Sequence, residues 1–63
     1  MKLKVMMIDG TMREAEQFSY VVQVWDCGEW KAIDVFQSTE EGYQRATGLM
    51  NQQEFESRVI QLF

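Results

Sequence analysis

Apolar and polar residues alternate along four segments of the chain, and this alternation predicts four strands. Residues 1–8 alternate and then end with apolar side chains on both faces, as in a strand that is covered on both sides. Residues 18–25 and 30–37 are rich in aromatic and β-branched side chains, and residues 57–63 form a last apolar segment. The period of two matches the way side chains point along a strand.

The two central segments are joined by Asp26-Cys27-Gly28-Glu29, which predicts a hairpin with a two-residue turn at Cys27-Gly28. The polar run Thr11–Gln17 follows the turn dipeptide Asp9-Gly10, and there we expect a loop rather than a tight hairpin. The register of the central hairpin places the following residues opposite each other: Val24 and Lys31, Val22 and Ile33, Tyr20 and Val35.

One helix is predicted between the third and fourth strands. Ser38 with Glu41 three residues later is a capping-box pattern, because the two side chains can satisfy two exposed backbone donors reciprocally. The helix is expected to continue to about Met50, with Gly42 small enough to allow a close approach to the sheet. Its inward face is expected to consist of Tyr43, Ala46, Thr47 and Met50.

The order strand, strand, strand, helix, strand predicts a single α+β domain over residues 1–63. We expect a mainly antiparallel four-stranded sheet (βββαβ) with the helix packed on one face. If the first three strands form a meander, the helix can deliver the last strand beside the first one and parallel to it. The predicted strand order across the sheet is therefore three, two, one, four.

Composition narrows the class of protein. The chain has 63 residues with one cysteine, Cys27, and no histidine, so neither a disulfide framework nor a closed zinc site is expected, and we predict no metal and no cofactor. No apolar run approaches the length of a membrane span, which favours a cytoplasmic protein without membrane contact. Burial in so small a domain barely offsets the ordering of the chain, so a homo-oligomer, most simply a dimer, is expected.

The residues offer little for catalysis. Histidine, the commonest general acid or base at neutral pH, is absent, and Cys27 lies among acids that raise rather than lower the pKa of a thiol. Glu40 and Glu41 are most simply the favourable acids of a first helical turn. We therefore expect a protein that is not an enzyme.

Negative charge is concentrated in the middle of the chain. The net charge is −4, and between positions 26 and 41 only Lys31 opposes five acids. This balance disfavours direct nucleic-acid binding and favours a protein partner with a basic surface, while the alternative is that mild acidity only keeps the protein soluble. The five acids are Asp26, Glu29, Asp34, Glu40 and Glu41.

Aromatic residues mark a candidate binding surface. The hairpin register places Trp25 directly opposite Trp30, on the face away from the helix, together with Val21, Ala32 and Phe36. One helix cannot cover both faces, so these residues need a cover from the segment 11–17, a second subunit or a partner. Tryptophan is enriched in binding hot spots, although a tryptophan pair can also simply stabilise a hairpin. The predicted partner-binding residues are Trp25, Asp26, Glu29, Trp30, Asp34, Phe36, Glu40 and Glu41.

From Phe18 to Phe63 the chain runs through an aromatic strand, an acid-flanked turn, a second strand, the helix start Ser38–Glu41 and a final strand. This succession resembles small phage-encoded proteins that disable host machinery, including the phage inhibitors of bacterial RNA polymerase, and residues 1–8 lie outside the resemblance. It implies a stoichiometric inhibitor that binds a host protein with a nucleic-acid channel, in the host cytoplasm. The alternatives are a homo-oligomeric structural or accessory protein and a small enzyme.

Overall fold

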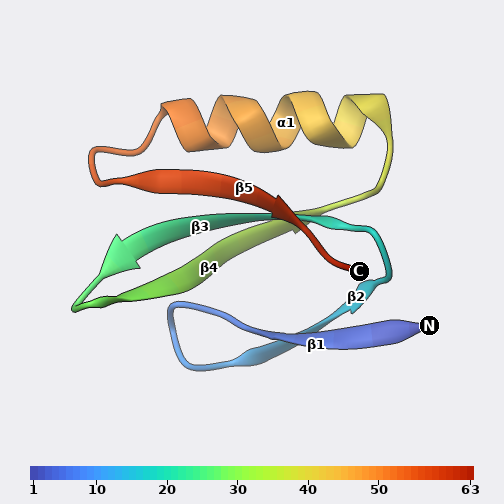
Figure 1. The fold of residues 1–63 in the computed structure, drawn as a ribbon, viewed down its shortest axis with the longest axis horizontal. Helices are drawn as coiled ribbons and strands as arrows, with labels where there is room; N and C mark the ends of the chain where they lie inside the picture. Colours follow the sequence, from blue (N-terminus) through green and yellow to red (C-terminus); the bar gives the residue numbers. More distant parts are fainter.

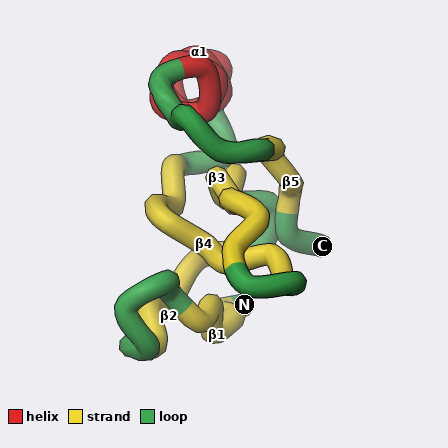
Figure 2. The backbone as a smooth tube through the Cα atoms, turned by 90° about the vertical axis from the view of Figure 1, so that its left-hand side faces the viewer, coloured by secondary structure: helices red, strands yellow, loops and turns green.

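Five strands and one helix form three layers in the computed structural model, which describes residues 1–63 (Figure 1). The helix lies on one side of a three-stranded sheet, and a two-stranded hairpin lies on the other side (Figure 2). The predicted α+β class is confirmed, but the strands form two small antiparallel sheets rather than a single four-stranded one. The elements are β1 (Lys2–Met6), β2 (Met12–Glu16), β3 (Tyr20–Asp26), β4 (Glu29–Phe36), α1 (Glu40–Asn51) and β5 (Ser57–Gln61).

The expected loop at residues 11–17 is wrong, because Met12–Glu16 forms β2 and pairs with β1 from Lys2↔Glu16 to Met6↔Met12. Only Ala15 is buried in β2, so this strand has almost no apolar alternation for a sequence pattern to detect. In the connecting loop, the Asp9 carboxylate accepts hydrogen bonds from the Thr11 hydroxyl at 2.6 Å and from its backbone N–H at 3.0 Å. These bonds hold the pKa of Asp9 below its usual value.

The three-stranded sheet has the order β4-β3-β5, with both neighbours antiparallel to β3. The predicted strand order is therefore wrong: the last strand lies beside β3 and not beside the first strand. Since β1 pairs with β2, the second edge of β3 is free, and the crossover through α1 delivers β5 there, parallel to β4. The ladder continues at both ends of β5, through Trp25 N–H to Glu56 O at 2.8 Å and Leu62 N–H to Ser19 O at 2.9 Å.

The turn between β3 and β4 is confirmed as a two-residue turn. Asp26 pairs with Glu29, and both central residues have positive φ, 52° at Cys27 and 82° at Gly28. Two positive φ values define the type I′ turn, whose twist matches that of the flanking strands. Glycine tolerates this conformation at the second position without strain.

A β-bulge in β4 changes the predicted register halfway along the hairpin. Pairing follows the prediction from the turn to Ala32, which lies opposite Gln23, but Val22 then pairs with Asp34, so Ile33 is the extra residue. The Asp34 carboxylate accepts the N–H of Val35 at 2.8 Å, which satisfies a donor on the outer edge of β4 next to the bulge. The bulge exchanges the faces of the residues that follow it, because the side-chain period is two.

The helix begins one residue later than predicted. Thr39, not Ser38, is the N-cap, and its hydroxyl accepts the N–H of Gly42 at 2.9 Å. Gly42 does make a close approach, but to the connection before the helix rather than to the sheet as predicted: a Cβ there would lie 2.0 Å from the backbone oxygen of Gln37. Ala46 is fully buried on the inner face of the helix.

The core consists of two thin apolar layers, one on each face of β3. Val21 and Val22 are the largest fully buried side chains, and as neighbours in a strand they point to opposite faces. Val21 packs with Met7 of the β1–β2 hairpin and with Ala32, so the hairpin covers part of the face that the helix leaves open. Only 9 of 63 residues are buried, which means that much apolar surface stays at the exterior.

Candidate functional site

The two tryptophans meet at the β3–β4 turn, at the end of the molecule away from both chain termini (Figure 1). Trp25 pairs directly with Trp30, their ring centroids are 5.3 Å apart, and the rings are inclined by 71° in an edge-to-face contact. Trp25 keeps 43% of its surface exposed, whereas Trp30 is half-buried. The predicted tryptophan pair is therefore present, and the Trp25 ring is partly exposed at the surface.

Trp30 also forms one wall of a cleft between the β3–β4 turn and the loop that follows β1. The cleft has a volume of about 220 Å³ and is lined on the other side by residues of the first hairpin, including Met6 and Ile8. Met6 is 65% exposed and Ile8 is 45% exposed. We call Trp25, Trp30, Met6 and Ile8 the tryptophan surface, since these exposed or half-buried apolar side chains surround one turn and one cleft.

Arg58 of β5 contributes a cation to this surface from the opposite edge of the sheet. Its guanidinium carbon lies 4.1 Å from the centre of a Trp30 ring, and its Nε donates a hydrogen bond to the Gln23 side chain at 2.7 Å. The hydrogen bond to Gln23 fixes the guanidinium of Arg58, and the cation–π contact then restricts the ring of Trp30. Trp30 is thus held between Trp25 and Arg58 in one orientation.

The acids of the turn are paired with one lysine. The Lys31 ammonium lies 3.1 Å from the Asp26 carboxylate and 3.8 Å from that of Glu29. The hydrogen bond from Lys31, followed by the one from Cys27, lowers the pKa of Asp26, and the bond to Asp26 raises the pKa of Lys31. With Arg58 and Glu56, which lies opposite Trp25, included, three acids and two bases stand at this end, so only a small excess of negative charge surrounds the tryptophan surface.

Asp34 lies outside the tryptophan surface. Its carboxylate forms an ion pair with Arg13 of β2 at 2.8 Å, in addition to capping the N–H of Val35. These two contacts give Asp34 a structural role: it stabilises the bulge and connects the first hairpin to β4. A salt bridge between side chains as exposed as these adds little by itself.

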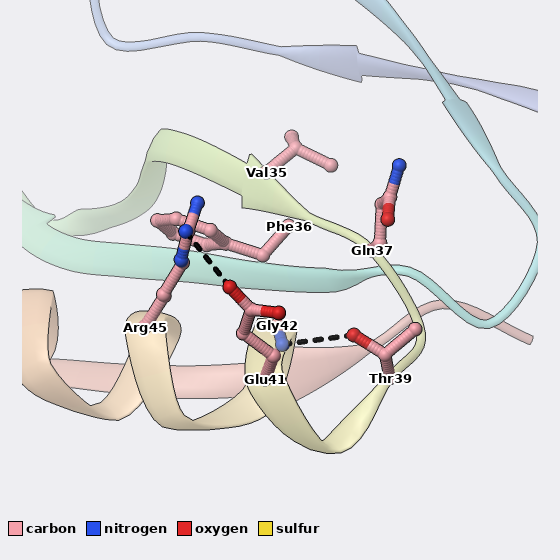
Figure 3. A pocket seen from close by; sticks show the side chains of 7 residues that line it. All are labelled: Val35, Phe36, Gln37, Thr39, Glu41, Gly42 and Arg45. Carbon is pink, nitrogen blue, oxygen red and sulfur yellow. Dashed lines mark hydrogen bonds and ion pairs between the residues drawn. The ribbon is translucent and has the colours of Figure 1, made fainter.

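Phe36 lies on the helix side of the sheet, contrary to the expectation that it shares a face with the tryptophans. The bulge places it opposite Tyr20, which packs edge-to-face against Tyr43 of the helix with ring centroids 5.1 Å apart. Phe36 lines a second cavity, of about 330 Å³, with Glu41 and residues around the start of α1 (Figure 3).

Glu40 and Glu41 occupy the first helical turn, where acids are favoured by the helix dipole. Glu41 forms an i,i+4 ion pair with Arg45 at 2.8 Å, which is visible in Figure 3. Of the eight predicted residues, the structure brings together Trp25, Asp26, Glu29 and Trp30. Four of the five acids of the middle segment form ion pairs at separate places, with Lys31, Arg13 and Arg45, so the segment does not form one acidic surface.

Sequence reasoning missed Met6, Ile8 and Arg58 at this surface. The sequence did contain a sign of Met6 and Ile8, because both lie on the face of the first strand that begins with Lys2 and Lys4. Apolar side chains on an otherwise polar face indicate that another part of the protein, or a partner, covers that face. The sequence contained no such sign of Arg58, since it lies 35 residues from Gln23 in sequence and reaches the tryptophan only through the pairing of β5 with β3.

No three side chains of histidine, cysteine, aspartate or glutamate lie close enough together to hold a metal ion. Cys27 is exposed at the tip of the turn with its sulfur 3.5 Å from the Asp26 carboxylate, which accepts its weak hydrogen bond. The tryptophan surface thus exposes mainly apolar and aromatic groups.

Comparison with known proteins adds no family to this description. No family model matches the chain, and no curated protein and no solved structure shows detectable similarity to it. The 12-residue α1 falls well short of what a bilayer crossing requires, so the fold contains no helix that could span a membrane. Inference about function therefore depends on the tryptophan surface itself.

Proposed function

We propose that this chain is a protein-binding module that engages its partner through the tryptophan surface. The observation that carries the proposal is the half-exposed Trp25 packed on Trp30 beside an apolar cleft of about 220 Å³. Exposed apolar groups that gather at one end of a small domain are typical of interaction sites. Tryptophan is the residue type most strongly associated with binding hot spots.

The surface is organised before binding, which favours affinity. Trp30 is held by Trp25 on one side and by the Arg58 guanidinium on the other, so little side-chain freedom is left to lose on association. The turn that presents both tryptophans is a tight type I′ turn between paired strands. An apolar side chain of the partner would enter the cleft between Trp30 and Ile8, with Trp25 covering its flank.

Charge acts over a longer distance in this proposal. The charges around the tryptophan surface leave only a small negative excess, but the whole chain carries a net charge of −4. A basic protein would approach such a chain faster, and the desolvated aromatic groups would then hold it. The partner class is a protein with a basic surface, including a host protein that normally binds nucleic acid, which the chain would inhibit by occupying it stoichiometrically.

Binding kinetics test this proposal through two kinds of variant. A partner captured from a bacterial lysate is measured by surface plasmon resonance against the wild type, Trp25→Ser and the matched control Phe55→Ser, which changes a 70%-exposed aromatic residue in the α1–β5 loop. Trp25→Ser is expected to dissociate roughly 30-fold faster, equivalent to about 2 kcal/mol, whereas Phe55→Ser is expected to bind like the wild type.

The charge variant Asp26→Asn with Glu29→Gln is expected to slow association and to flatten its dependence on salt, with a smaller effect on dissociation. Circular dichroism confirms that each variant is folded. The proposal is wrong if Trp25→Ser and Phe55→Ser bind the partner with the same rates as the wild type, since the tryptophans would then only stabilise the hairpin.

A further inference from the structure

The outer edge of β5 has backbone groups that no other strand uses. The hydrogen bonds at Glu56 and Leu62 show which residues of β5 direct their backbone groups towards β3, namely the even-numbered ones. In an antiparallel ladder, alternate residues bond inward, so the N–H and C=O groups of Ser57, Val59 and Gln61 point away from β3. In Figure 2, β5 and the chain end that follows it are the outermost elements on their side of the sheet.

The opposite edge, on β4, is protected by three separate features. Ile8 donates its N–H to the Ala32 oxygen at 2.8 Å, the Asp34 carboxylate occupies the N–H of Val35 at 2.8 Å, and the bulge breaks the regular spacing. A bulge, a charged side chain and a covering segment are the usual means by which proteins prevent a strand from adding to an edge. Strand addition at β4 is therefore blocked.

The edge of β5 has no comparable protection. The only charged residue in this strand is Arg58, and its guanidinium is drawn back across the sheet to Gln23 of β3 and Trp30 of β4. The chain contains no proline that could interrupt the edge. Of the two edges of the three-stranded sheet, the β5 edge is therefore the one available for pairing.

We propose that β5 pairs antiparallel with β5 of a second copy of this chain, with Val59 facing its own counterpart across a two-fold axis. Ser57 of each copy then faces Gln61 of the other, and the outward backbone groups of all three residues find partners. The two three-stranded sheets join into one continuous sheet of the order β4-β3-β5-β5-β3-β4.

A second copy fits this edge because the side chains beside it are apolar and self-complementary. Arg45 and Glu41 lie on the β4 side of the helix at the cavity with Phe36, so Tyr43, about 200° away around the helix axis, lies on the β5 side. Tyr43 is 49% exposed and Met50 is half-buried. The two-fold axis is perpendicular to the sheet and keeps both helices on one face.

In that arrangement the two copies of β3, over which the helices pack, are three strand spacings apart, or about 14 Å. This separation exceeds the 8–10 Å of helices in direct contact, so side chains as large as Tyr43 and Met50 from both copies fit between them. The strand contains no acid, which allows two chains of charge −4 to approach each other at this edge. The thin core, with 9 of 63 residues buried, leaves apolar area for such an interface.

The dimer leaves the proposed binding surface free and does not depend on it. Antiparallel pairing places the two β3–β4 turns at opposite ends of the joined sheet and on the same face. Each assembly would then present two tryptophan surfaces to a partner.

Amide hydrogen exchange on the wild-type chain, at about 1 μM and at about 500 μM, tests this pairing together with sedimentation equilibrium. Sedimentation is expected to show a dimer at the higher concentration. The amides of Val59 and Gln61 are then expected to exchange at least tenfold more slowly than in the dilute sample, whereas Arg58 and Ile60, which bond to β3, are protected in both. A monomer at 500 μM, or a dimer without this added protection, would overturn the proposal.

Of the backbone hydrogen-bonding groups, the variant Val59→Pro removes only an outward N–H, at a position where edge strands accept proline, and it is expected to be a folded monomer by circular dichroism and sedimentation. A folded Val59→Pro dimer would overturn the proposal. If the variant does not fold, the exchange rates of the Val59 and Gln61 amides in the wild type decide whether β5 pairs with β5. Trp25→Ser is expected to remain a dimer. A monomeric but folded Trp25→Ser would place the contact at the tryptophan surface instead.

Discussion

At the scale of single residues, the turn at Asp26–Glu29 shows how local geometry and charge act together. The type I′ turn requires two positive φ values, and it brings Asp26, Glu29 and Lys31 within reach of one another. The pKa of Asp26 falls below its usual value of 3.8 because Lys31 and then Cys27 donate hydrogen bonds to its carboxylate. The folded chain therefore releases the proton of Asp26 more readily than the unfolded chain does.

This pKa shift predicts the pH dependence of stability. Because the folded pKa is depressed, the contribution of Asp26 is fully present above the unfolded value near 3.8 and is lost as pH falls through the folded value. Asp26→Asn is expected to lower the melting temperature at pH 7 and to have a smaller effect at pH 2. Melting curves from pH 7 to pH 2 provide the measurement, and in a Lys31→Met background the difference at pH 7 should shrink. A difference that persists unchanged at pH 2 would contradict this assignment.

At the scale of elements, the start of α1 shows how two adjacent cap candidates are resolved. Ser38 and Thr39 both precede acids, but the chain must pass close to Gln37, and only Gly42 allows this contact. With Gly42 at the third helical position, the hydroxyl that meets its N–H belongs to Thr39. The place where the helix begins is thus decided by packing against the end of β4.

Alanine substitution separates the two caps. Thr39→Ala is expected to lower the free energy of unfolding by about 1 kcal/mol, because the N–H of Gly42 loses its acceptor. Ser38→Ala is the matched control and is expected to change stability by less than about 0.5 kcal/mol. Urea denaturation measures the free energy of unfolding of both variants, and its dependence on urea concentration should stay the same as in the wild type. The reverse ranking would mean that Ser38 caps the helix in solution.

At the scale of the whole molecule, one face of the sheet is covered by the helix and part of the other by the first hairpin. The hairpin docks through Met7, which is 6% exposed, against Val21 and Ala32. Met6, its neighbour in sequence, points the other way and is 65% exposed at the tryptophan surface. Two adjacent methionines therefore have different roles, one in the core and one at the candidate site.

The two methionines provide a matched test of this docking. Met7→Ala is expected to cost at least about 2 kcal/mol, since it opens a cavity between the hairpin and the sheet, whereas Met6→Ala is expected to cost less than about 0.5 kcal/mol. Chemical denaturation followed by tryptophan fluorescence gives both values. Equal effects of the two substitutions would show that the hairpin does not dock in the described way.

The sequence by itself determined those features that depend on neighbours along the chain. Residues 18–37 carry the alternation and the turn dipeptide of a hairpin, so the pairing of Trp25 with Trp30 could be predicted, as could the α+β class and the extent of the helix. Each of these features needs only the local period of apolar residues and the backbone preferences of a turn or cap.

Only the tertiary structure decided which strands pair and which residues share a face. The period of an apolar pattern reports burial, but every backbone offers the same hydrogen-bonding groups, so nothing in β5 specifies β3 as its neighbour. The bulge at Ile33 reverses the faces of Val35 and Phe36 without changing the composition of the strand. Arg58 reaches Trp30 for the same reason, because long-range pairing brings together residues that the sequence keeps far apart.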